Sequence, residues 1–384
     1  MRAIERGRAD LTTAMVATYH GPMTAFDASV FAQRRADAAQ LVRRGGLGGF
    51  IIGTGPELAY LTGSWTTSHE RLTALIIPPS GQARLLAPAT DSGSFERIDV
   101  PVTTWKDGDD PYRMAAQLVD AAPVGLGSSL TADHVFALQA VLDQTVLASE
   151  AVAELFMVKD AVEAEQLARA GAAIDRVHDR VAGLLVPGRT EREVAQALEL
   201  LILEEHERVE FIIVGSGPNG SNPHHDFSDR VLQPGDPVVV DLGGALDTGY
   251  QSDCTRTHIV PGDSAPADFA EAARVLEEAF SAACAAARPG ITAGQLDAAA
   301  RGVIERAGYG ELFTHRLGHG IGLAGHEAPF IIGGSDVVLQ EGMVFSIEPG
   351  LYKPGEWGMR IENIVRLSAD GAQTLNSTEW RILP

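Results

Sequence analysis

Three histidines, four glycines and one glutamate occur within the thirteen residues from His315 to Glu327, which read HRLGHGIGLAGHE. Imidazole and carboxylate groups are side chains that often hold metal ions or transfer protons. Glycines among them allow the backbone to approach a bound group closely. This stretch therefore indicates a reactive site rather than a simple connection.

Four acidic residues in runs that are otherwise typical of β-strands are the second chemical signal. Asp241 lies in VVVDLGG and Asp253 in QSDCTRT, and two glutamates, Glu348 and Glu362, lie in FSIEPG and MRIENIV. Buried carboxylates need compensating positive charge, and Arg360 is the one basic residue that we place on a strand with them. Divalent metal can supply the rest, and oxygen ligands with one imidazole suit Mn²⁺, with Co²⁺ and Zn²⁺ as alternatives. The ligands predicted for two carboxylate-bridged ions are Asp241, Asp253, His319, Glu348 and Glu362.

Taken alone, each of these side chains could have an ordinary structural role instead of binding metal. A strand carboxylate is most often exposed to solvent, and a lone histidine such as His319 is most often a structural loop residue. Four acids in corresponding positions of a repeat make that alternative much weaker. Cys254, next to Asp253, should point to the opposite face of its strand, so it is not predicted to be a ligand.

An internal repeat supplies the elements that position these side chains. LLVPGRTEREVAQALELLILEE is similar to AARPGITAGQLDAAARGVIERAG, and VLQPGDPVVVDLGG is similar to VLQEGMVFSIEPG. The second match aligns Asp241 with Glu348 at an offset of 348 − 241 = 107 residues. Each half therefore reads as two helices, a loop with histidine and a strand with a carboxylate. A pseudo-two-fold axis between the halves would bring the carboxylates together at the centre.

The first part of the chain has a different pattern, in which helical and strand signals alternate. The predicted helices are 29–44, 112–122 and 132–144, and the predicted strands are 49–53, 72–79 and 83–88. A long amphipathic helix is predicted to open the second part. We therefore predict a disordered extension over 1–22, an α/β domain over 23–156 and a second domain over 157–384.

Composition narrows the partners and the compartment. The net charge of −21 would repel nucleic acid and anionic membranes, so neither is predicted as a partner. The two cysteines, Cys254 and Cys284, are too few for a disulfide framework, which favours a cytoplasmic location.

Five segments in this order resemble the creatinase/methionine aminopeptidase ("pita-bread") family, specifically its proline-directed branch of Xaa-Pro dipeptidases (prolidases) and aminopeptidase P. They are GSGPNGSNPHH, VVVDLGGALDTGYQSDCTRT, THRLGHGIGLAGHE, FSIEPGLY and GMRIENI. The resemblance covers nearly everything after Met23 and implies an α+β fold. In that fold, a pita-bread metallopeptidase domain with a pseudo-two-fold internal repeat follows a creatinase-like α/β N-terminal domain. It also implies a homodimer, in which one subunit's N-terminal domain restricts access to the other's active site.

The resemblance implies a role for each predicted ligand of a dinuclear metal centre. Asp253 and Glu362 match carboxylates that bridge the two ions. Asp241 matches a ligand of one ion, and His319 and Glu348 match ligands of the other. The implied reaction is hydrolysis of the X-Pro bond of short peptides by a metal-bridging hydroxide. Glu348 can accept and relay the proton.

Three further residues match positions around the substrate, and a fourth matches a residue that supports a metal ligand. His224 and His326 match histidines that contact the scissile carbonyl and the tetrahedral intermediate, where hydrogen bonds stabilise developing charge. His315 matches a histidine near the proline subsite. Arg360 matches an arginine that steadies a bridging carboxylate. A short proline-containing peptide is thus the expected partner of the three histidines.

Departures from the family pattern leave the substrate length open. Many prolidases have an arginine at the position of Phe330 that binds the free carboxylate of a dipeptide. Phe330 therefore keeps aminopeptidase P, which removes the first residue of longer X-Pro peptides, as the alternative to an Xaa-Pro dipeptidase. Dipeptide selectivity would need another cation, and Arg71 of a neighbouring subunit is one candidate. Asn363 stands where an aspartate often follows the last ligand.

Two more distant functions fit this sequence less well. A creatinase-like hydrolase works without metal and lacks these ligands, and non-catalytic scaffolds on the same fold also lose ligands. The complete predicted set of five therefore favours a metallopeptidase over both.

Overall fold

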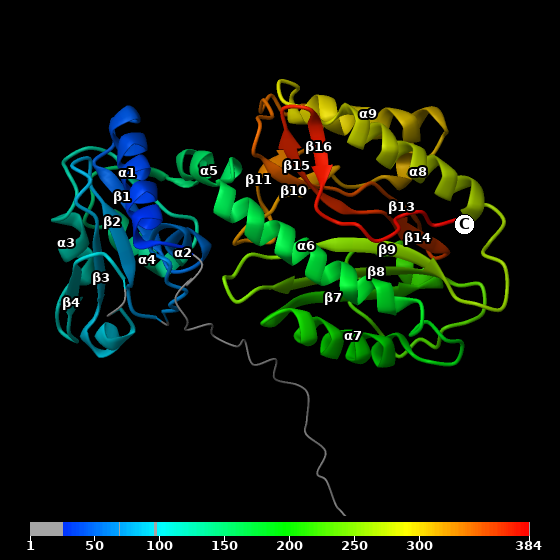
Figure 1. Ribbon diagram of the computed structural model, residues 1–384. Helices are drawn as coiled ribbons and strands as arrows, with labels where there is room; N and C mark the ends of the chain where they lie inside the picture. The colour runs from blue at the N-terminus through cyan, green and yellow to red at the C-terminus, as the bar shows by residue number, and fades with distance from the viewer. Residues whose placement is uncertain (1–25, 69, 96–97, 384) are drawn as a thin grey trace, which may run out of the picture.

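The computed structural model describes residues 26–68, 70–95 and 98–383. Two domains follow one another along the chain and are joined through α5 (Ser149–Met157) and α6 (Ala161–Val181), as Figure 1 shows. The predicted disordered extension, residues 1–22, lies outside the described residues. The boundary between 156 and 157 falls near the end of α5 and stays a prediction.

A mixed sheet of six strands forms the centre of the N-terminal domain, in the order β4-β3-β2-β1-β5-β6. Its strands are β1 (Gly49–Gly53), β2 (Ala74–Ile77), β3 (Arg84–Pro88), β4 (Val102–Trp105), β5 (Val124–Leu126) and β6 (Thr145–Leu147). The helices before α5 are α1 (Ala28–Arg44), α2 (Pro56–Thr62), α3 (Pro111–Ala116) and α4 (Ala132–Gln139), with a 3₁₀ helix η1 (Ala89–Phe95). All the predicted elements are present. The predictions 112–122 and 132–144 run past the ends of α3 and α4, because helix ends are the part that sequence patterns locate least well.

The second domain contains two similar halves. The first half consists of α6, α7 (Glu191–Glu205), β7 (Arg208–Ser216), η2 (Gly217–Ser221), β8 (Pro237–Ala245) and β9 (Cys254–Ile259). The second half opens with α8 (Phe269–Ala286), α9 (Ala293–Arg306) and η3 (Gly310–Leu312). Its strands are β10 (Gly318–Gly320), β11 (Glu327–Ile331), β12 (Val344–Ile347), β13 (Gly350–Lys353), β14 (Trp357–Arg360), β15 (Asn363–Ser368) and β16 (Gly371–Thr374). The strands lie between α7 on one side and α8 with α9 on the other (Figure 1).

Each half starts its second helix in the same way. At Gly188 and Gly290 the backbone φ is 91° and 93°, a conformation that residues other than glycine rarely adopt. Two residues later, Thr190 and Thr292 cap α7 and α9, at an offset of 292 − 190 = 102 residues. Each threonine accepts a hydrogen bond from the backbone three residues on, and the side chain there accepts one in return. The repeated Pro-Gly-x-Thr sequence therefore builds the same turn and cap twice.

The second repeated segment also has the same position in both halves. Thr190 forms a β-bridge with Val231, and Thr292 forms one with Val338. The bridged valines are 338 − 231 = 107 residues apart, which is the offset of the matching carboxylates. The domain is thus a pita-bread domain with an internal repeat, and the α+β fold class predicted from the sequence is confirmed.

A shared apolar core joins the two domains. Leu58 and Tyr60 from α2 belong to the same buried cluster as Tyr250 and Leu323 of the second domain. The ion pairs of Arg34, on α1, with two acids at the start of α6 lie at the same junction. The N-terminal domain is therefore packed against the domain that carries the candidate site. Among the described residues, none of the helices combines the length and apolarity that crossing a membrane requires.

Candidate metal centre

The four predicted acids converge, although only one of them lies inside a strand. Asp241 is in β8, whereas Asp253 directly precedes β9. Glu348 lies between β12 and β13, and Glu362 lies between β14 and β15. The prediction that all four sit within strands is therefore wrong for three of them. Asp253, Glu348 and Glu362 lie where one strand has ended and the next has not begun. Their side chains therefore need not alternate between the two faces of one sheet, and the four carboxylates can point to a common centre.

Ligand atoms of these acids and of two histidines lie within reach of common metal ions. Three overlapping groups have ligand atoms within 4.8 Å of one another. The groups are Asp253, His319 and His326; His319, Glu348 and Glu362; and Asp241, Asp253 and Glu362. All five predicted ligands are thus brought together. His326 also reaches this cluster, with its ring centroid 3.9 Å from that of His319.

The electrostatics of the cluster fit bound cations. Burial raises the pKa of Asp253 and of Glu362 well above the usual range, and repulsion from the neighbouring carboxylates adds to it. Burial likewise raises the pKa of Glu348 to about 7. Oδ1 of Asp241 and Oε1 of Glu362 are buried and have no hydrogen-bond donor among the described residues. Oxygen atoms in this state are suitable ligands for two divalent ions.

His319 is prepared to bind metal as a neutral imidazole. Its Nδ1 lies 3.0 Å from the backbone oxygen of Gly320, which leaves Nε2 for a ligand. Nε2 lies 3.3 Å from Oε1 of Glu348 and 3.6 Å from Oδ2 of Asp253. Burial lowers the pKa of His319 to about 3, so the ring is unprotonated at neutral pH. The backbone contact therefore orients the nitrogen toward the acids.

Arg360 supports the cluster through two routes. Its Nη2 donates to Oδ2 of Asp241 at 2.6 Å. Its Nε donates to Oγ1 of Thr255 at 2.9 Å, and that hydroxyl donates to Oε2 of Glu362 at 2.8 Å. The direct partner is therefore Asp241, whereas the resemblance implies a bridging carboxylate. Glu362, which the resemblance makes a bridging carboxylate, is reached only through the hydroxyl.

A second buried arginine was missed in the sequence. Arg256 lies on β9, which begins directly after Asp253, just as Arg360 ends β14 two residues before Glu362, so the prediction that Arg360 is the one basic residue on the strands beside the acids is wrong. Nη1 of Arg256 donates to the backbone oxygen of Glu362 at 2.6 Å, and Nη2 donates to Oδ1 of Asn363 at 2.8 Å. Asn363 thus has a defined role as an acceptor. The motif QSDCTRT contains Arg256, three residues after Asp253, and could have shown it.

The three predicted substrate histidines differ in how directly they are linked to the cluster. His315 Nε2 lies 3.1 Å from the hydroxyl of Tyr352, which also accepts from Nη1 of Arg360 at 2.7 Å. Burial lowers the pKa of His315 to about 4. His224 is exposed on the loop after η2, and its charge affects the pKa of both His315 and His326. His326 therefore lies against the cluster, and His315 is linked through Tyr352 to Arg360 beside it.

Arg316 is a cation at this entrance that sequence reasoning passed over. Its Cζ lies 4.6 Å from the centre of the Phe330 ring, and its Nη2 lies 3.4 Å from Nδ1 of His326. Across the described part of the chain, Arg316 forms no ion pair within 4.0 Å. The register of β10 and β11 explains the position of Arg316. His319 of β10 pairs with Phe330 of β11, and Arg316 lies three residues before His319, so it is close to Phe330. The guanidinium of Arg316, which pairs with no described acid, thus lies against the ring of Phe330. Phe330 is the residue that stands in place of the arginine found in many prolidases.

The other candidate cation, Arg71, lies in the N-terminal domain. Its Nη2 pairs with Asp107 at 3.0 Å, and its Nη1 lies 3.3 Å from Oγ1 of Thr90. Its delivery to the site of a neighbouring subunit stays a prediction. Arg316 is already in place within the same chain.

Comparison with known proteins gives matches along most of the chain. Residues 165–369 match "Metallopeptidase family M24", and residues 34–158 match "Creatinase/Prolidase N-terminal domain". "Probable dipeptidase PepE" of Mycobacterium tuberculosis is 46% identical over 367 residues, covering 93% of this chain and 97% of that protein. "Xaa-Pro dipeptidase" of Lactobacillus delbrueckii subsp. lactis is 36% identical, covering 85% of this chain and 92% of its own length. The crystal structure of dipeptidase PepE from Mycobacterium ulcerans has a TM-score of 0.90 at 46% identity, covering 93% and 98% of the two chains.

Proposed function

The chain belongs to metallopeptidase family M24, and from that premise we propose that it hydrolyses the X-Pro bond of dipeptides as an Xaa-Pro dipeptidase. The observation that carries the proposal is the converged set of five predicted metal ligands, with His326 against it and His315 linked to it through Tyr352 and Arg360. Relatives named as dipeptidases and Xaa-Pro dipeptidases support the substrate class. The predicted resemblance to proline-directed members of this family agrees with these matches.

The proposed metal ligands are Asp241, Asp253, His319, Glu348 and Glu362. Two divalent ions held there would acidify water and polarise the scissile carbonyl. Glu348, whose pKa is raised to about 7, is suited to accept and relay a proton. Arg360 holds the carboxylate of Asp241 in position through the 2.6 Å hydrogen bond from its Nη2.

The histidines are proposed to contact the peptide. His224 and His326 donate hydrogen bonds to the scissile carbonyl as oxyanion charge develops. His315, held by the hydroxyl of Tyr352, faces the proline ring. Because burial keeps His315 neutral, it can pack against an apolar ring without bringing a charge.

Selectivity for dipeptides is proposed to come from Arg316. A carboxylate prefers a planar guanidinium, which can donate two parallel hydrogen bonds. The guanidinium carbon lies 4.6 Å from the centre of the Phe330 ring, and Arg316 forms no ion pair with an acid of the described chain. The free carboxylate of a dipeptide therefore has a cation to bind although residue 330 is not an arginine.

Aminopeptidase P activity is the second candidate, and the exposed ring of Phe330 favours it. This side chain is 41% exposed and carries no charge that would require a free carboxylate. A longer peptide could pass over it. The two activities differ only in the length of peptide that is admitted.

Hydrolysis of three peptides by enzyme stripped with a chelator and resupplied with Mn²⁺ tests the proposal. Cleavage of Ala-Pro, with little cleavage of Ala-Pro-Ala or Ala-Ala, is the expected result. Efficient cleavage of Ala-Pro-Ala would instead identify an aminopeptidase P. Cleavage of none of the three by metal-loaded enzyme would contradict the proposed substrate class.

Three further properties belong to the same proposal. Mn²⁺ is the proposed metal because four carboxylates and one imidazole suit it, with Co²⁺ or Zn²⁺ as alternatives. A homodimer is proposed from the family resemblance, and light scattering at micromolar concentration would test it. A cytoplasmic location is proposed because both Cys254 and Cys284 are free thiols.

A further inference from the structure

A fully buried acid begins the second helix in the first half of the repeat. Glu191, the first residue of α7, is 0% exposed. Its two oxygens accept hydrogen bonds from the hydroxyl groups of Ser216 and Ser228, both at 2.6 Å, and from Nδ2 of Asn219 at 3.0 Å. Nε2 of His225 lies 2.9 Å from Oε2 of the same acid. One carboxylate therefore binds four side chains along a single loop.

This loop, residues 216–228, carries His224, which we propose contacts the scissile carbonyl. The carboxylate on α7 also accepts from the backbone nitrogens of the first and last residues of the loop, at 2.8 and 2.9 Å. Between these ends, the backbone oxygen of Pro223 accepts from Nη1 of Arg360 at 3.2 Å. The same arginine donates to a proposed metal ligand, Asp241. His224 therefore follows directly after the point at which the loop meets the metal cluster.

The second half has a fully buried acid on its second helix too. Asp297, on α9, is 0% exposed. Its Oδ1 accepts from the backbone nitrogen of Leu317 at 3.1 Å, and its two oxygens accept from Arg301, one turn further along α9. Nη2 of Arg301 donates to the backbone oxygen of His315 at 2.9 Å, and Nη1 donates to that of Phe313 at 3.2 Å. The acid and its arginine thus bind three residues of one loop.

This second loop, residues 313–317, also meets the metal cluster. The backbone oxygen of Leu317 accepts from the backbone nitrogen of Glu348 at 2.8 Å. Another proposed ligand, His319, follows Leu317 by two residues. The residue that Asp297 holds through its nitrogen is therefore the residue that binds Glu348 through its oxygen.

The two acids occupy related places in the repeat, but they do not share its offset. The threonine caps of α7 and α9 are 102 residues apart, whereas the acids are 297 − 191 = 106 residues apart. Asp297 thus lies about one helical turn later on its helix than Glu191 does. Ala293 stands at the position that corresponds to Glu191. The shared role of the acids is therefore visible in their contacts and not in the alignment of the two halves.

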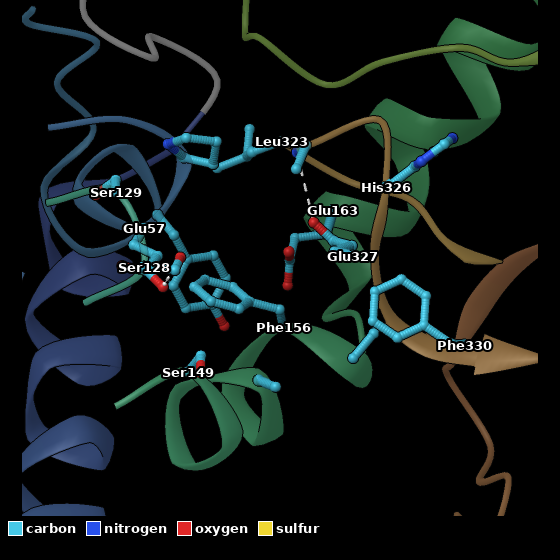
Figure 2. A pocket seen from close by; sticks show the side chains of 15 residues that line it. Glu57, Ser128, Ser129, Ser149, Phe156, Glu163, Leu323, His326, Glu327 and Phe330 are labelled. Atoms are coloured by element: carbon cyan, nitrogen blue, oxygen red, sulfur yellow. Dashed lines mark hydrogen bonds between the residues drawn. The ribbon is translucent and has the colours of Figure 1, made fainter. Parts of the chain in front are cut away.

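His326, the third histidine proposed to contact the peptide, is held in a different way. The residue after it, Glu327, forms an ion pair with the buried Nζ of Lys159. His326 and Glu327 both line a cavity of about 250 Å³ between the two domains, as Figure 2 shows. The segment of His326 is thus held at the junction of the domains, which makes this histidine an internal comparison for the other two.

We propose that the two buried acids, Glu191 and Asp297, are positioning residues for the reaction. Glu191 fixes the loop of His224 against the metal centre, and Asp297 fixes the loop of His315. Hydrogen bonds to a carboxylate are among the stronger ones in proteins, so each acid can hold its loop firmly. Firm positioning matters because a displacement of about 1 Å can cost roughly a hundredfold in rate. This inference rests on the proposed contacts of both histidines with an X-Pro dipeptide.

Double-mutant cycles on kcat/KM for Ala-Pro test whether each acid acts through its own histidine. Glu191→Gln should lower kcat/KM by about 10- to 100-fold, mainly through kcat, because His224 is proposed to bind charge that develops in the transition state. In a His224→Ala background, the same substitution should change kcat/KM by less than about twofold. In a His315→Ala or His326→Ala background, it should keep its full effect.

The cycle for the second acid should give the converse pattern. Asp297→Asn should lose most of its effect in a His315→Ala background and keep it in a His224→Ala background. Its effect should lie mainly in KM, because His315 is proposed to pack against the proline ring already in the bound substrate. Effects that multiply in every background would overturn the inference. Wild-type kcat/KM in His224→Ala and His315→Ala would also overturn it, because the acids would then have no histidine to act through.

Glu193→Gln is the matched control for Glu191→Gln. Glu193 lies in the same first turn of α7, is exposed, and loses the same charge on substitution. Its counterpart in the capping box of α9 is already a glutamine, Gln295. The control variant should therefore keep the kcat and KM of wild type. A loss as large as that in Glu191→Gln would overturn the inference.

Milder variants replace any acid variant that does not fold. Ser228→Ala removes one donor from Glu191 and leaves the acid in place. Arg301→Lys keeps a positive charge beside Asp297 and removes the paired contacts to the second loop. Each should give a smaller loss of kcat/KM that disappears when the histidine of its own loop is alanine. A loss that persists there would overturn the inference.

Hydrogen exchange of the Mn²⁺-loaded enzyme tests the positioning without turnover. Glu191→Gln should accelerate amide exchange in residues 216–228 more than in residues 313–317, and Asp297→Asn should do the reverse. Equal acceleration of both loops in each variant would indicate only a loss of global stability and would overturn the inference. If Ala-Pro is not cleaved at all, the proposed function fails, and the exchange pattern alone then decides whether each acid holds its own loop.

Discussion

Replacing Asp253 with asparagine should stabilise the metal-free protein and abolish its stabilisation by metal. Without metal, Asp253 is buried among acids whose ligand atoms lie within 4.8 Å of its own. Two unit charges about 4 Å apart repel by roughly 4 kcal/mol at an effective dielectric of 20. Protonation relieves part of this, because the pKa of Asp253 is raised well above its usual range. We therefore expect Asp253→Asn to raise the free energy of unfolding by about 1 to 3 kcal/mol in chelator.

Bound metal should reverse which of the two proteins, wild type or Asp253→Asn, is the more stable. At a free metal concentration of 1,000 times Kd, binding to the native state alone stabilises it by about 4 kcal/mol. Wild type should gain this stability when Mn²⁺ replaces the chelator, whereas Asp253→Asn should gain little of it. At an unfolding entropy of about 2.1 cal/mol/K per residue, 1 kcal/mol shifts the Tm of a chain of 384 residues by roughly 1 °C, so both effects are measurable as shifts in Tm.

The pH dependence gives an independent check on the cause. A carboxyl whose pKa is raised on folding lowers stability as the pH rises above its unfolded value. The gain from Asp253→Asn in chelator should therefore be larger at pH 8 than at pH 5, where Asp253 is more often protonated already. Equal gains at both values would argue against charge repulsion.

Glu191 provides the matched control, because it is a buried carboxylate with the opposite surroundings. It accepts hydrogen bonds from Ser216, Asn219 and Ser228. These contacts hold its pKa below the usual value despite burial. Glu191→Gln should lower stability by about 1 to 3 kcal/mol with or without metal. If Asp253→Asn behaves like this control in chelator, or if it keeps the Tm shift of wild type on adding Mn²⁺, the argument for a metal-dependent cluster is wrong.

Three further predictions concern selectivity, the repeat and acid stability. Arg316→Gln should lower kcat/KM for Ala-Pro by about 10- to 100-fold, with little change for Ala-Pro amide, because a charge-assisted hydrogen bond contributes about 1.5 to 3 kcal/mol; equal losses on both substrates would remove Arg316 from carboxylate binding. Thr190→Ala and Thr292→Ala should each cost about 1 kcal/mol in denaturant unfolding, since each cap has the same geometry, and a large difference between them would contradict equivalent roles. Burial lowers the pKa of His206 to about 4, so the unfolded chain binds this proton first as the pH falls below 6.5. The stability lost between pH 7 and pH 5 should be about 2 kcal/mol smaller in His206→Gln than in wild type, and an equal loss would exclude this histidine as the cause.

Repetition made the broad arrangement of the second domain predictable from the sequence. The matches around Thr190 and Thr292, and around Asp241 and Glu348, correspond to repeated caps and bridges in the structure. Local turn chemistry fixes such features, so they are visible in short stretches of sequence. The convergence of the acids followed from the repeat and not from any one strand.

The precise surroundings of the acids were not predictable in the same way. Strand-like composition continues through Asp253 and Glu362, but the pairing changes there, and that change depends on distant parts of the chain. Arg256 was overlooked because its partners are the backbone of Glu362 and the side chain of Asn363, more than 100 residues away. The stacking of Arg316 on Phe330 depends on the register of β10 and β11, which the motif alone does not give. The roles proposed for the site residues and the domain boundary stay predictions.

The apolar core that joins the domains has a consequence for how this protein can be divided. Leu58 and Tyr60 are buried against Tyr250 and Leu323, so cutting the chain near residue 157 would expose both surfaces to water. Neither fragment is therefore a self-sufficient module, and heating should produce one cooperative calorimetric transition and not two. Exchanging the N-terminal domain with that of a relative would require matching substitutions on both sides of this shared core. The two domains are therefore constrained to evolve together.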